Sequence, residues 1–171
     1  FADKPYTLQK SNGKLKFGHY ENGHLISKTL TFHKDSYYID LEINYLNETG
    51  ENWTFNDRLV LNSISANTKP ESSRLFEAVF FGQETKRKNP LGIKGKYTHP
   101  DTISALGFRD RYSCIIVGAQ GLNQAEAYIE KQNSVGEVGL ALNNIVVGPQ
   151  SEAAYKTVLY CGPQEVNYLK Q

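Results

Sequence analysis

The sequence lacks the features that mark membrane-spanning or zinc-binding proteins. No apolar run in its 171 residues approaches the roughly 20 that a membrane helix needs. The opening residues Phe1 to Pro5 do not form a leader with charged, apolar and small-residue regions. The only two cysteines, Cys114 and Cys161, are too far apart to act as paired zinc ligands. The remaining composition, 39% hydrophobic and 22% charged, is typical of one soluble globular domain.

A strong excess of charge of one sign is also missing. The net charge is +1, and lysines and glutamates are interspersed, so no dense basic face for nucleic acid is expected. The one basic cluster, Lys86-Arg87-Lys88, directly precedes Asn89-Pro90. We interpret it as a solvated loop rather than a phosphate-binding site.

Catalytic signatures are absent as well. The sequence has no nucleophile elbow, P-loop, dinucleotide-binding or H-E-x-x-H motif. His19 and His24 flank a predicted hairpin turn, and an enzyme hypothesis pairs them with Glu21 or Asp35 for proton transfer at a sugar. We favour the alternative that histidines beside a turn are solvated or satisfied locally. His99 shows no partner, and we predict no catalytic, cofactor or metal-binding residue.

Short strands make up what is present. Residues 14–20 and 24–32 alternate in hydrophobicity on either side of Asn22-Gly23, a strong hairpin signal. In residues 37–45 the apolar side chains occupy every second position, with Asp40, Glu42 and Asn44 between them. This pattern predicts one face in a core and one in water.

Further strands are expected along the rest of the chain. They cover residues 53–55, 58–64, 75–81, 103–108, 112–117, 125–131, 138–147 and 153–161, and residues 82–100 form a long excursion with at most short strands. Many short strands separated by turn residues predict an all-β fold, an antiparallel sandwich of two sheets.

Two features leave alternatives open. Cys114 and Cys161 both lie in apolar strand-like runs, so they form either a disulfide in an oxidising compartment or two buried free thiols. Asp110-Arg111 precedes the central strand, and we interpret it as an ion pair that orients the entry to that strand.

The end of the sequence predicts a change of structure. The last strand stops at Gly162-Pro163, and Pro163-Gln164-Glu165 starts a short C-terminal helix with proline near its first position. Val166 and Leu169 stand three apart, as on one helix face. We therefore divide the chain into a β-sandwich over residues 1–162 and the start of a helical linker over residues 163–171.

This segment, Val158 to Lys170, resembles the end of the large periplasmic domain of YidC-type membrane protein insertases. In that family a strand ends in an aromatic residue, a small apolar residue and Gly-Pro-Lys before a short helix. This chain departs at Gln164, which stands where the family usually has lysine. Residues 31–47 and the entry Asp110 to Ile115 are also similar to the family's pattern.

The resemblance implies an extended sandwich like that of galactose mutarotase, followed by a linker and membrane helices beyond Gln171. It implies a non-catalytic domain on the periplasmic side of the bacterial inner membrane. Its partners would be Sec translocon components and nascent membrane proteins. The residues expected to form the linker or an interaction site are Tyr160, Gly162, Pro163, Val166, Tyr168 and Leu169. The alternative function is a carbohydrate-binding or aldose-epimerase-like module on the same fold.

Overall fold

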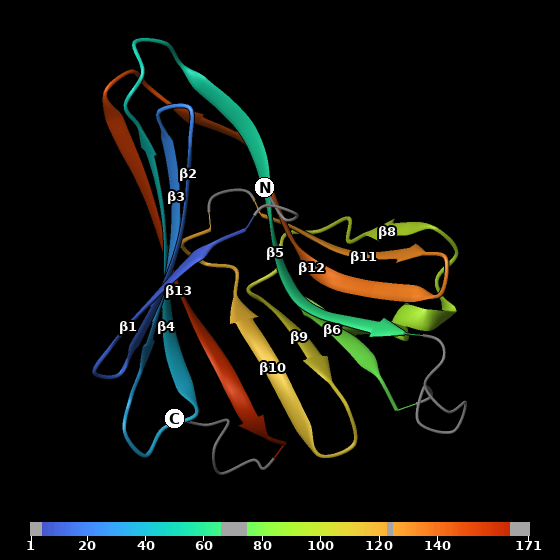
Figure 1. The fold of residues 1–171 in the computed structure, drawn as a ribbon. Helices are drawn as coiled ribbons and strands as arrows, with labels where there is room; N and C mark the ends of the chain where they lie inside the picture. The colour runs from blue at the N-terminus through green and yellow to red at the C-terminus, as the bar shows by residue number, and fades with distance from the viewer. Residues whose placement is uncertain (1–4, 66–74, 123–124, 165–171) are drawn as a thin grey trace.

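The computed structural model describes residues 5–65, 75–122 and 125–164, which form two antiparallel sheets (Figure 1). The large sheet has nine strands in the order β1-β2-β3-β4-β13-β10-β9-β6-β7, and the small sheet has the order β5-β12-β11-β8. The strands are β1 (Thr7–Ser11), β2 (Lys14–Glu21), β3 (His24–Phe32), β4 (Tyr38–Asn47), β5 (Trp53–Ser65), β6 (Glu77–Phe81), β7 (Lys86–Lys88), β8 (Lys96–Thr98), β9 (Ala105–Arg109), β10 (Ser113–Gly118), β11 (Glu126–Gln132), β12 (Val135–Val147) and β13 (Ser151–Pro163). The predicted all-β sandwich is confirmed.

The predicted hairpin between β2 and β3 forms at Asn22-Gly23. Both residues adopt positive φ, 53° and 77° respectively, as a two-residue hairpin turn requires. Glu21 pairs with His24 across the turn, and the register continues to Lys14 opposite Thr31. One strand was not predicted: β1 pairs with β2 at the edge of the large sheet, and all five of its residues are exposed.

Strand β4 has the predicted alternation. Leu41, Ile43 and Tyr45 are buried in the core, whereas Asp40 and Glu42 lie on the opposite face. The neighbour of β4 on one side is β3, and on the other side it is β13, the last strand in the sequence. Ten residue pairs join β13 to β4, from Ser151 opposite Asn47 to Tyr160 opposite Tyr38. This pairing joins the N-terminal hairpins to the β10-β9-β6 half of the sheet.

The core between the sheets contains one polar contact inside an aromatic cluster. The Tyr45 hydroxyl donates a 2.8 Å hydrogen bond to Oδ2 of the buried Asp57 on β5. The Lys28 ammonium from β3 lies 3.4 Å from the same carboxylate. The Tyr45 ring packs edge-on against Trp53, Phe55 and Tyr155. Burial, and then the charge of Asp57, raise the pKa of Tyr45, so its hydroxyl remains a donor.

A buried amide ties two loops together. Asn47 is fully buried, and its Nδ2 donates to the carbonyl oxygens of Glu51, Val147 and Gly148 at 2.7, 3.0 and 2.9 Å. Its Oδ1 accepts from the backbone and hydroxyl of Thr49. Because these bonds satisfy both ends of the amide, the β4–β5 loop is fixed to the start of the β12–β13 connection.

The predicted excursion over residues 82–100 contains only β7, β8 and the 3₁₀ turn η1 (Pro90–Gly92). The Asn89 side chain accepts a hydrogen bond from the Leu91 backbone at the start of η1. His99 does have partners, contrary to the prediction. It is buried and stacks on Phe80, and its Nδ1 lies 3.2 Å from the backbone nitrogen and 3.2 Å from the carbonyl oxygen of Asp101.

The predicted short C-terminal helix is not shown. Pro163, expected near its first position, still belongs to β13 and pairs with Ser113. The Gln164 backbone nitrogen then donates to the Tyr112 carbonyl oxygen at 3.2 Å, which keeps this stretch beside β10. Val166, Tyr168 and Leu169 lie outside the described residues.

The two cysteines are both free. Cys114 pairs with Gly162 and Cys161 pairs with Ile115, so the two thiols are one register position apart and point to opposite faces of the sheet. Cys114 is buried and Cys161 is exposed, so only one of the two predicted buried thiols is found. Burial raises the pKa of Cys114.

We expect a thiol reagent to modify Cys161 in the native protein and Cys114 only after unfolding, because the thiolate of an exposed cysteine is the reactive form. Titration of the denatured, unreduced protein should give two thiols per chain. Serine variants at each position assign the fast and the slow phase. A count of zero under denaturing conditions contradicts the opposite-facing arrangement.

Candidate functional site

The predicted linker residues that the structure describes meet at the end of β13. We call the group Tyr37, Asp110, Tyr160, Gly162, Pro163 and Gln164 the exit joint. The Tyr160 ring is 3% exposed, and its hydroxyl donates to the Pro163 carbonyl at 2.7 Å. Its ring centroid lies 5.3 Å from that of Tyr38, its partner across β4. The hydroxyl of a buried tyrosine therefore holds the end of β13 in place.

Gly162 is required by the close approach of Tyr37. A Cβ built at Gly162 would lie 2.7 Å from the Tyr37 ring, a distance that side chains do not tolerate. The Tyr37 carbonyl oxygen also accepts from the Cys161 backbone nitrogen at 2.9 Å. The β3–β4 turn thus covers the end of β13. The sequence did not predict this contact.

Gln164 holds the other side of the joint. Its side-chain nitrogen donates to the carbonyl oxygens of Asp110 and Ser113 at 2.5 and 3.1 Å. Its side-chain oxygen accepts from Arg109, whose guanidinium also forms a 2.5 Å ion pair with Glu77. The glutamine that departs from the family's lysine therefore fastens the chain to the β9–β10 turn. A long-range amide contact of this kind gives no sequence signal.

Asp110 stabilises that turn, but not through the predicted ion pair with Arg111. Its carboxylate accepts hydrogen bonds from the backbone nitrogens of Tyr112 and Ser113 and from the Ser113 hydroxyl. Burial acts to raise the pKa of Asp110, but the bonds from Ser113 and Tyr112 outweigh it and lower the pKa below 3.8. The Arg111 guanidinium instead lies 5.4 Å from the centre of the Tyr112 ring.

The histidines do not converge on a catalytic arrangement. His19 lies opposite Ile26 rather than His24, its Nδ1 is 2.9 Å from the Pro5 carbonyl, and its Nε2 is 3.7 Å from Glu21. His24 stacks on Trp53 with ring centroids 4.4 Å apart. Asp35 lies in the β3–β4 turn, at the opposite end of β3 from His24. His19 and His24 therefore make separate local contacts and do not converge on one site.

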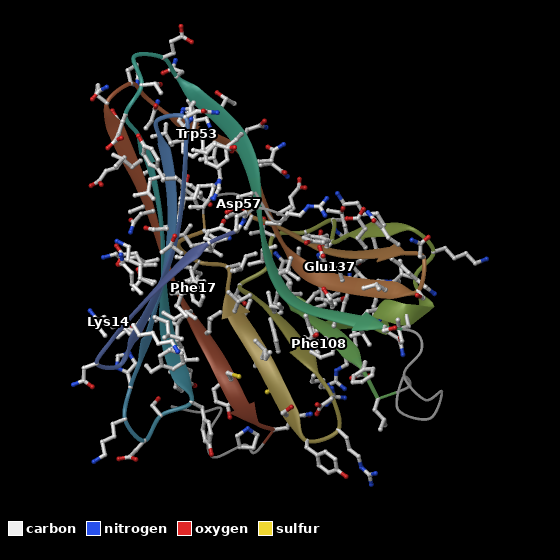
Figure 2. All side chains as sticks on the ribbon, in the orientation of Figure 1. Lys14, Phe17, Trp53, Asp57, Phe108 and Glu137 are labelled. Carbon is white, nitrogen blue, oxygen red and sulfur yellow. The ribbon has the colours of Figure 1, made fainter. Side chains whose placement is uncertain are left out.

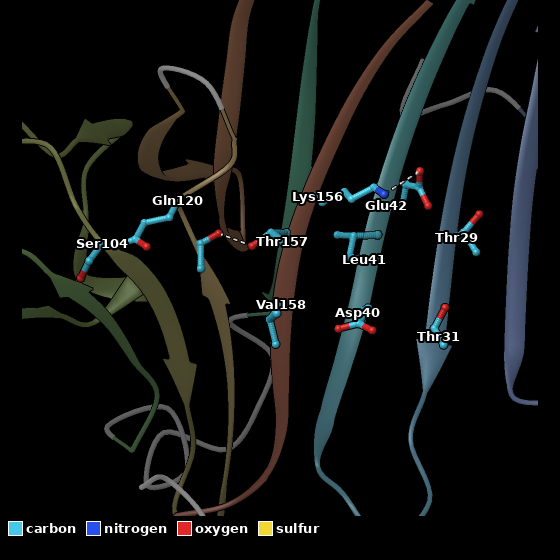
Figure 3. A pocket seen from close by; sticks show the side chains of 11 residues that line it. Thr29, Thr31, Asp40, Leu41, Glu42, Ser104, Gln120, Lys156, Thr157 and Val158 are labelled. Atoms are coloured by element: carbon cyan, nitrogen blue, oxygen red, sulfur yellow. Dashed lines mark hydrogen bonds and ion pairs between the residues drawn. The ribbon is translucent and has the colours of Figure 1, made fainter. Parts of the chain in front are cut away.

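An open cleft of about 640 Å³ lies on the large sheet around β3, β4 and β13 (Figure 3). Its polar side chains include Asp40 and Glu42, whose carboxylates are engaged by His33 at 2.8 Å and Lys156 at 3.8 Å. The residues that line it include no histidine and no aromatic ring. An epimerase needs an acid and a base that face one sugar, and sugar-binding sites commonly offer an aromatic face. The residues that line this cleft therefore favour neither an epimerase site nor a sugar-binding site.

The parts of the chain that the structure describes contain no group of three or more His, Cys, Asp or Glu side chains arranged to hold a metal. In the same residues no helix combines the length and hydrophobicity needed to cross a membrane.

The fold defines an all-β domain of the supersandwich type. The chain belongs to the YidC periplasmic domain family, whose model matches residues 2–171. That family is the extracytoplasmic domain of a membrane protein insertase and is not enzymatic. A search of curated proteins finds no match.

Solved structures with similar folds include proteins described as sugar-active enzymes. A galactose mutarotase related enzyme from Lactobacillus acidophilus has a TM-score of 0.61 at 7% identity, over 91% of this chain and 70% of that chain. A putative aldose 1-epimerase from Escherichia coli K12 gives 0.60 at 7%, over 92% and 68%. An α-galactosidase from Geobacillus stearothermophilus gives 0.61 at 11%, over 91% and 24%. At these identities the likeness establishes the predicted mutarotase-like fold alone.

We expect Gly162→Ala to destabilise the domain by about 1–3 kcal/mol, because the added methyl group must displace the Tyr37 ring. Denaturant unfolding measures the change. Gly50→Ala is a matched control, since a Cβ there meets nothing within 4 Å. In a Tyr37→Ala background the cost of Gly162→Ala should fall to near that of the control. An equal cost in both backgrounds contradicts the role assigned to Tyr37.

The Asp110 turn predicts a pH dependence. A carboxyl whose folded pKa is depressed contributes stability above its unfolded pKa, near 3.8, and loses that contribution as the pH falls through the folded pKa. Asp110→Asn should therefore be less stable than the wild type at neutral pH, with the difference shrinking below about pH 4. Unfolding curves across this range measure it, and a constant difference contradicts the assignment.

Proposed function

We propose that the chain is the non-catalytic periplasmic domain of an insertase that assists insertion and folding of bacterial inner-membrane proteins. It acts alone or beside the Sec translocon, and membrane segments outside this chain anchor it. The family match over residues 2–171 carries this proposal. Sec translocon components and nascent membrane proteins are the proposed partners, and nucleic acid is not.

The exit joint supports the proposed connection to the membrane part. Tyr160, Gly162 and Pro163 hold the end of β13 by a hydroxyl bond and close ring packing. Gln164 adds bonds to the β9–β10 turn. A strand end that is held on both sides keeps a fixed orientation relative to the sheet. Such a fixed end suits a connection between two domains of one protein. The linker over residues 163–171, with Val166, Tyr168 and Leu169, stays a prediction.

Two observations support the absence of catalysis. The two hairpin histidines make local contacts, one with Pro5 and one with Trp53. The two cleft carboxylates Asp40 and Glu42 each face a basic group within 4 Å. Both carboxylates of the cleft therefore have a basic partner in the described structure.

A carbohydrate-binding or aldose-epimerase-like module is the second candidate. The mutarotase-like fold favours it, and the open cleft of about 640 Å³ is the surface on which sugar binding would be tested. It predicts that aldoses raise the melting temperature of the domain, and that Asp40→Asn abolishes this shift. The insertase proposal predicts no shift with galactose or glucose at millimolar concentration.

We expect His19→Ala/His24→Ala in the full-length protein to leave membrane insertion of a substrate protein within about twofold of wild type, since neither residue serves catalysis. Insertion is measured in cells depleted of the native insertase. Crosslinkers placed on the exposed surface of this domain should capture translocon components or inserting chains.

A substrate-insertion defect larger than tenfold, with melting temperature unchanged, would overturn the non-catalytic proposal. Gly50→Ala in the same full-length protein is the control for expression and assembly, because the added methyl group contacts nothing. Deletion of the whole domain without any effect on insertion, translocon contact or folding of substrates would overturn the insertase role itself.

A further inference from the structure

The two ends of the large sheet differ in charge. At the end where β13 stops, which we call the exit end, lie the β1–β2, β3–β4 and β9–β10 turns. At the opposite end, the far end, lie the β2–β3, β4–β5 and β12–β13 connections. Figure 2 places Lys14 toward the first of these ends and Trp53 toward the second.

The far end is acidic. Its three connections, residues 21–24, 48–52 and 148–152, carry four glutamates and neither lysine nor arginine. These glutamates are Glu21, Glu48, Glu51 and Glu152. The turns and adjoining residues of the exit end carry four cations, Lys10, Lys14, Lys34 and Arg111, against Asp35 and Asp110. Four cations against two carboxylates leave the exit end with an excess of positive charge.

The exit end also gathers the exposed aromatic rings. Four aromatic side chains of the described residues are exposed, and three of them, Phe32, Tyr37 and Tyr112, lie at these turns with 42, 41 and 73% exposure. The fourth, Tyr20, is near the far end and donates to Glu48. Tyr112 stands at the tip of the β9–β10 hairpin with Arg111 over its ring. No core function explains a ring that is 73% exposed.

Aromatic rings beside cations at one end of a domain match the surface of an anionic bilayer. Tyrosine and phenylalanine partition into the interface at headgroup level. Each lysine or arginine near an anionic leaflet contributes about 1 kcal/mol. The acidic far end is repelled by the same surface, so the charge distribution selects one orientation.

We propose that the turns of the exit end, 11–14, 32–38 and 110–113, dock on the anionic phospholipid surface of the membrane. Tyr112 and Phe32 enter the headgroup layer, Lys14, Lys34 and Arg111 contact lipid phosphates, and the glutamates of the far end point away. In this orientation the strands that form the cleft on the large sheet point away from the membrane surface. This inference rests on the proposed function only for the presence of a membrane beside the domain.

Vesicle flotation of the 171-residue chain tests the docking. Binding to vesicles of phosphatidylethanolamine and phosphatidylglycerol should exceed binding to phosphatidylcholine vesicles and fall with added salt. Lys34→Glu/Arg111→Glu should weaken it by roughly tenfold or more, and Tyr112→Ser by about fivefold. Matched controls are Lys94→Glu, an exposed lysine beyond η1, and Tyr20→Ser at the far end. Both controls should bind like wild type.

The orientation has a separate readout. Tyr112→Trp should be quenched by brominated lipid when vesicles are added, whereas Tyr20→Trp should not, with buried Trp53 as a constant background. No binding to anionic vesicles, equal loss in the control variants, or equal quenching at both positions overturns the proposal. The two proposals fail separately. Vesicle binding without any effect of the domain on insertion in cells overturns the insertase role alone, whereas an effect on insertion without vesicle binding overturns the docking alone.

Discussion

The hydrogen bond between Tyr45 and Asp57 joins the two sheets at a defined position. Apolar contacts alone tolerate sliding of one sheet over another, whereas a buried carboxylate tolerates only positions that keep its partners. Tyr45 comes from the large sheet, Asp57 from the small one, and Lys28 supplies the compensating charge. The aromatic rings around the contact exclude water and strengthen it. Strand β5, which carries Asp57, is long and curved (Figure 1).

The sequence predicts the parts of this fold that depend on local pattern. Alternation in β4 and the Asn22-Gly23 turn were predictable because period-two burial and positive φ act within a few residues. Strand β1 was missed because all its residues are exposed and no alternation distinguishes it from a loop. Pro163, predicted near the first position of a helix, is extended because it pairs with Ser113 in the sheet. The rest of the predicted helix lies outside the described residues.

The candidate site was only half predictable. Tyr160 and Gly162 could be found as the end of a strand, but their partner Tyr37 is more than 120 residues away in sequence and forms no motif with them. The Gln164 contacts with the β9–β10 turn span 51 and 54 residues. The sequence could not show how the two hairpin histidines lie, because this depends on register: His19 pairs with Ile26, so His19 and His24 are not opposite each other across the turn. Family membership indicates an extracytoplasmic domain of a membrane protein.

The position of β13 has a consequence for the order of folding. This strand is last in the sequence but lies between β4 and β10 in the large sheet. Until it is available, the strands on either side of it have no common neighbour in the large sheet. Non-local closure of this kind is slow, because the entropy of a long loop is lost before contacts compensate for it. The large sheet is therefore complete only after β13 has been synthesised, and one edge of β4 is unpaired until then.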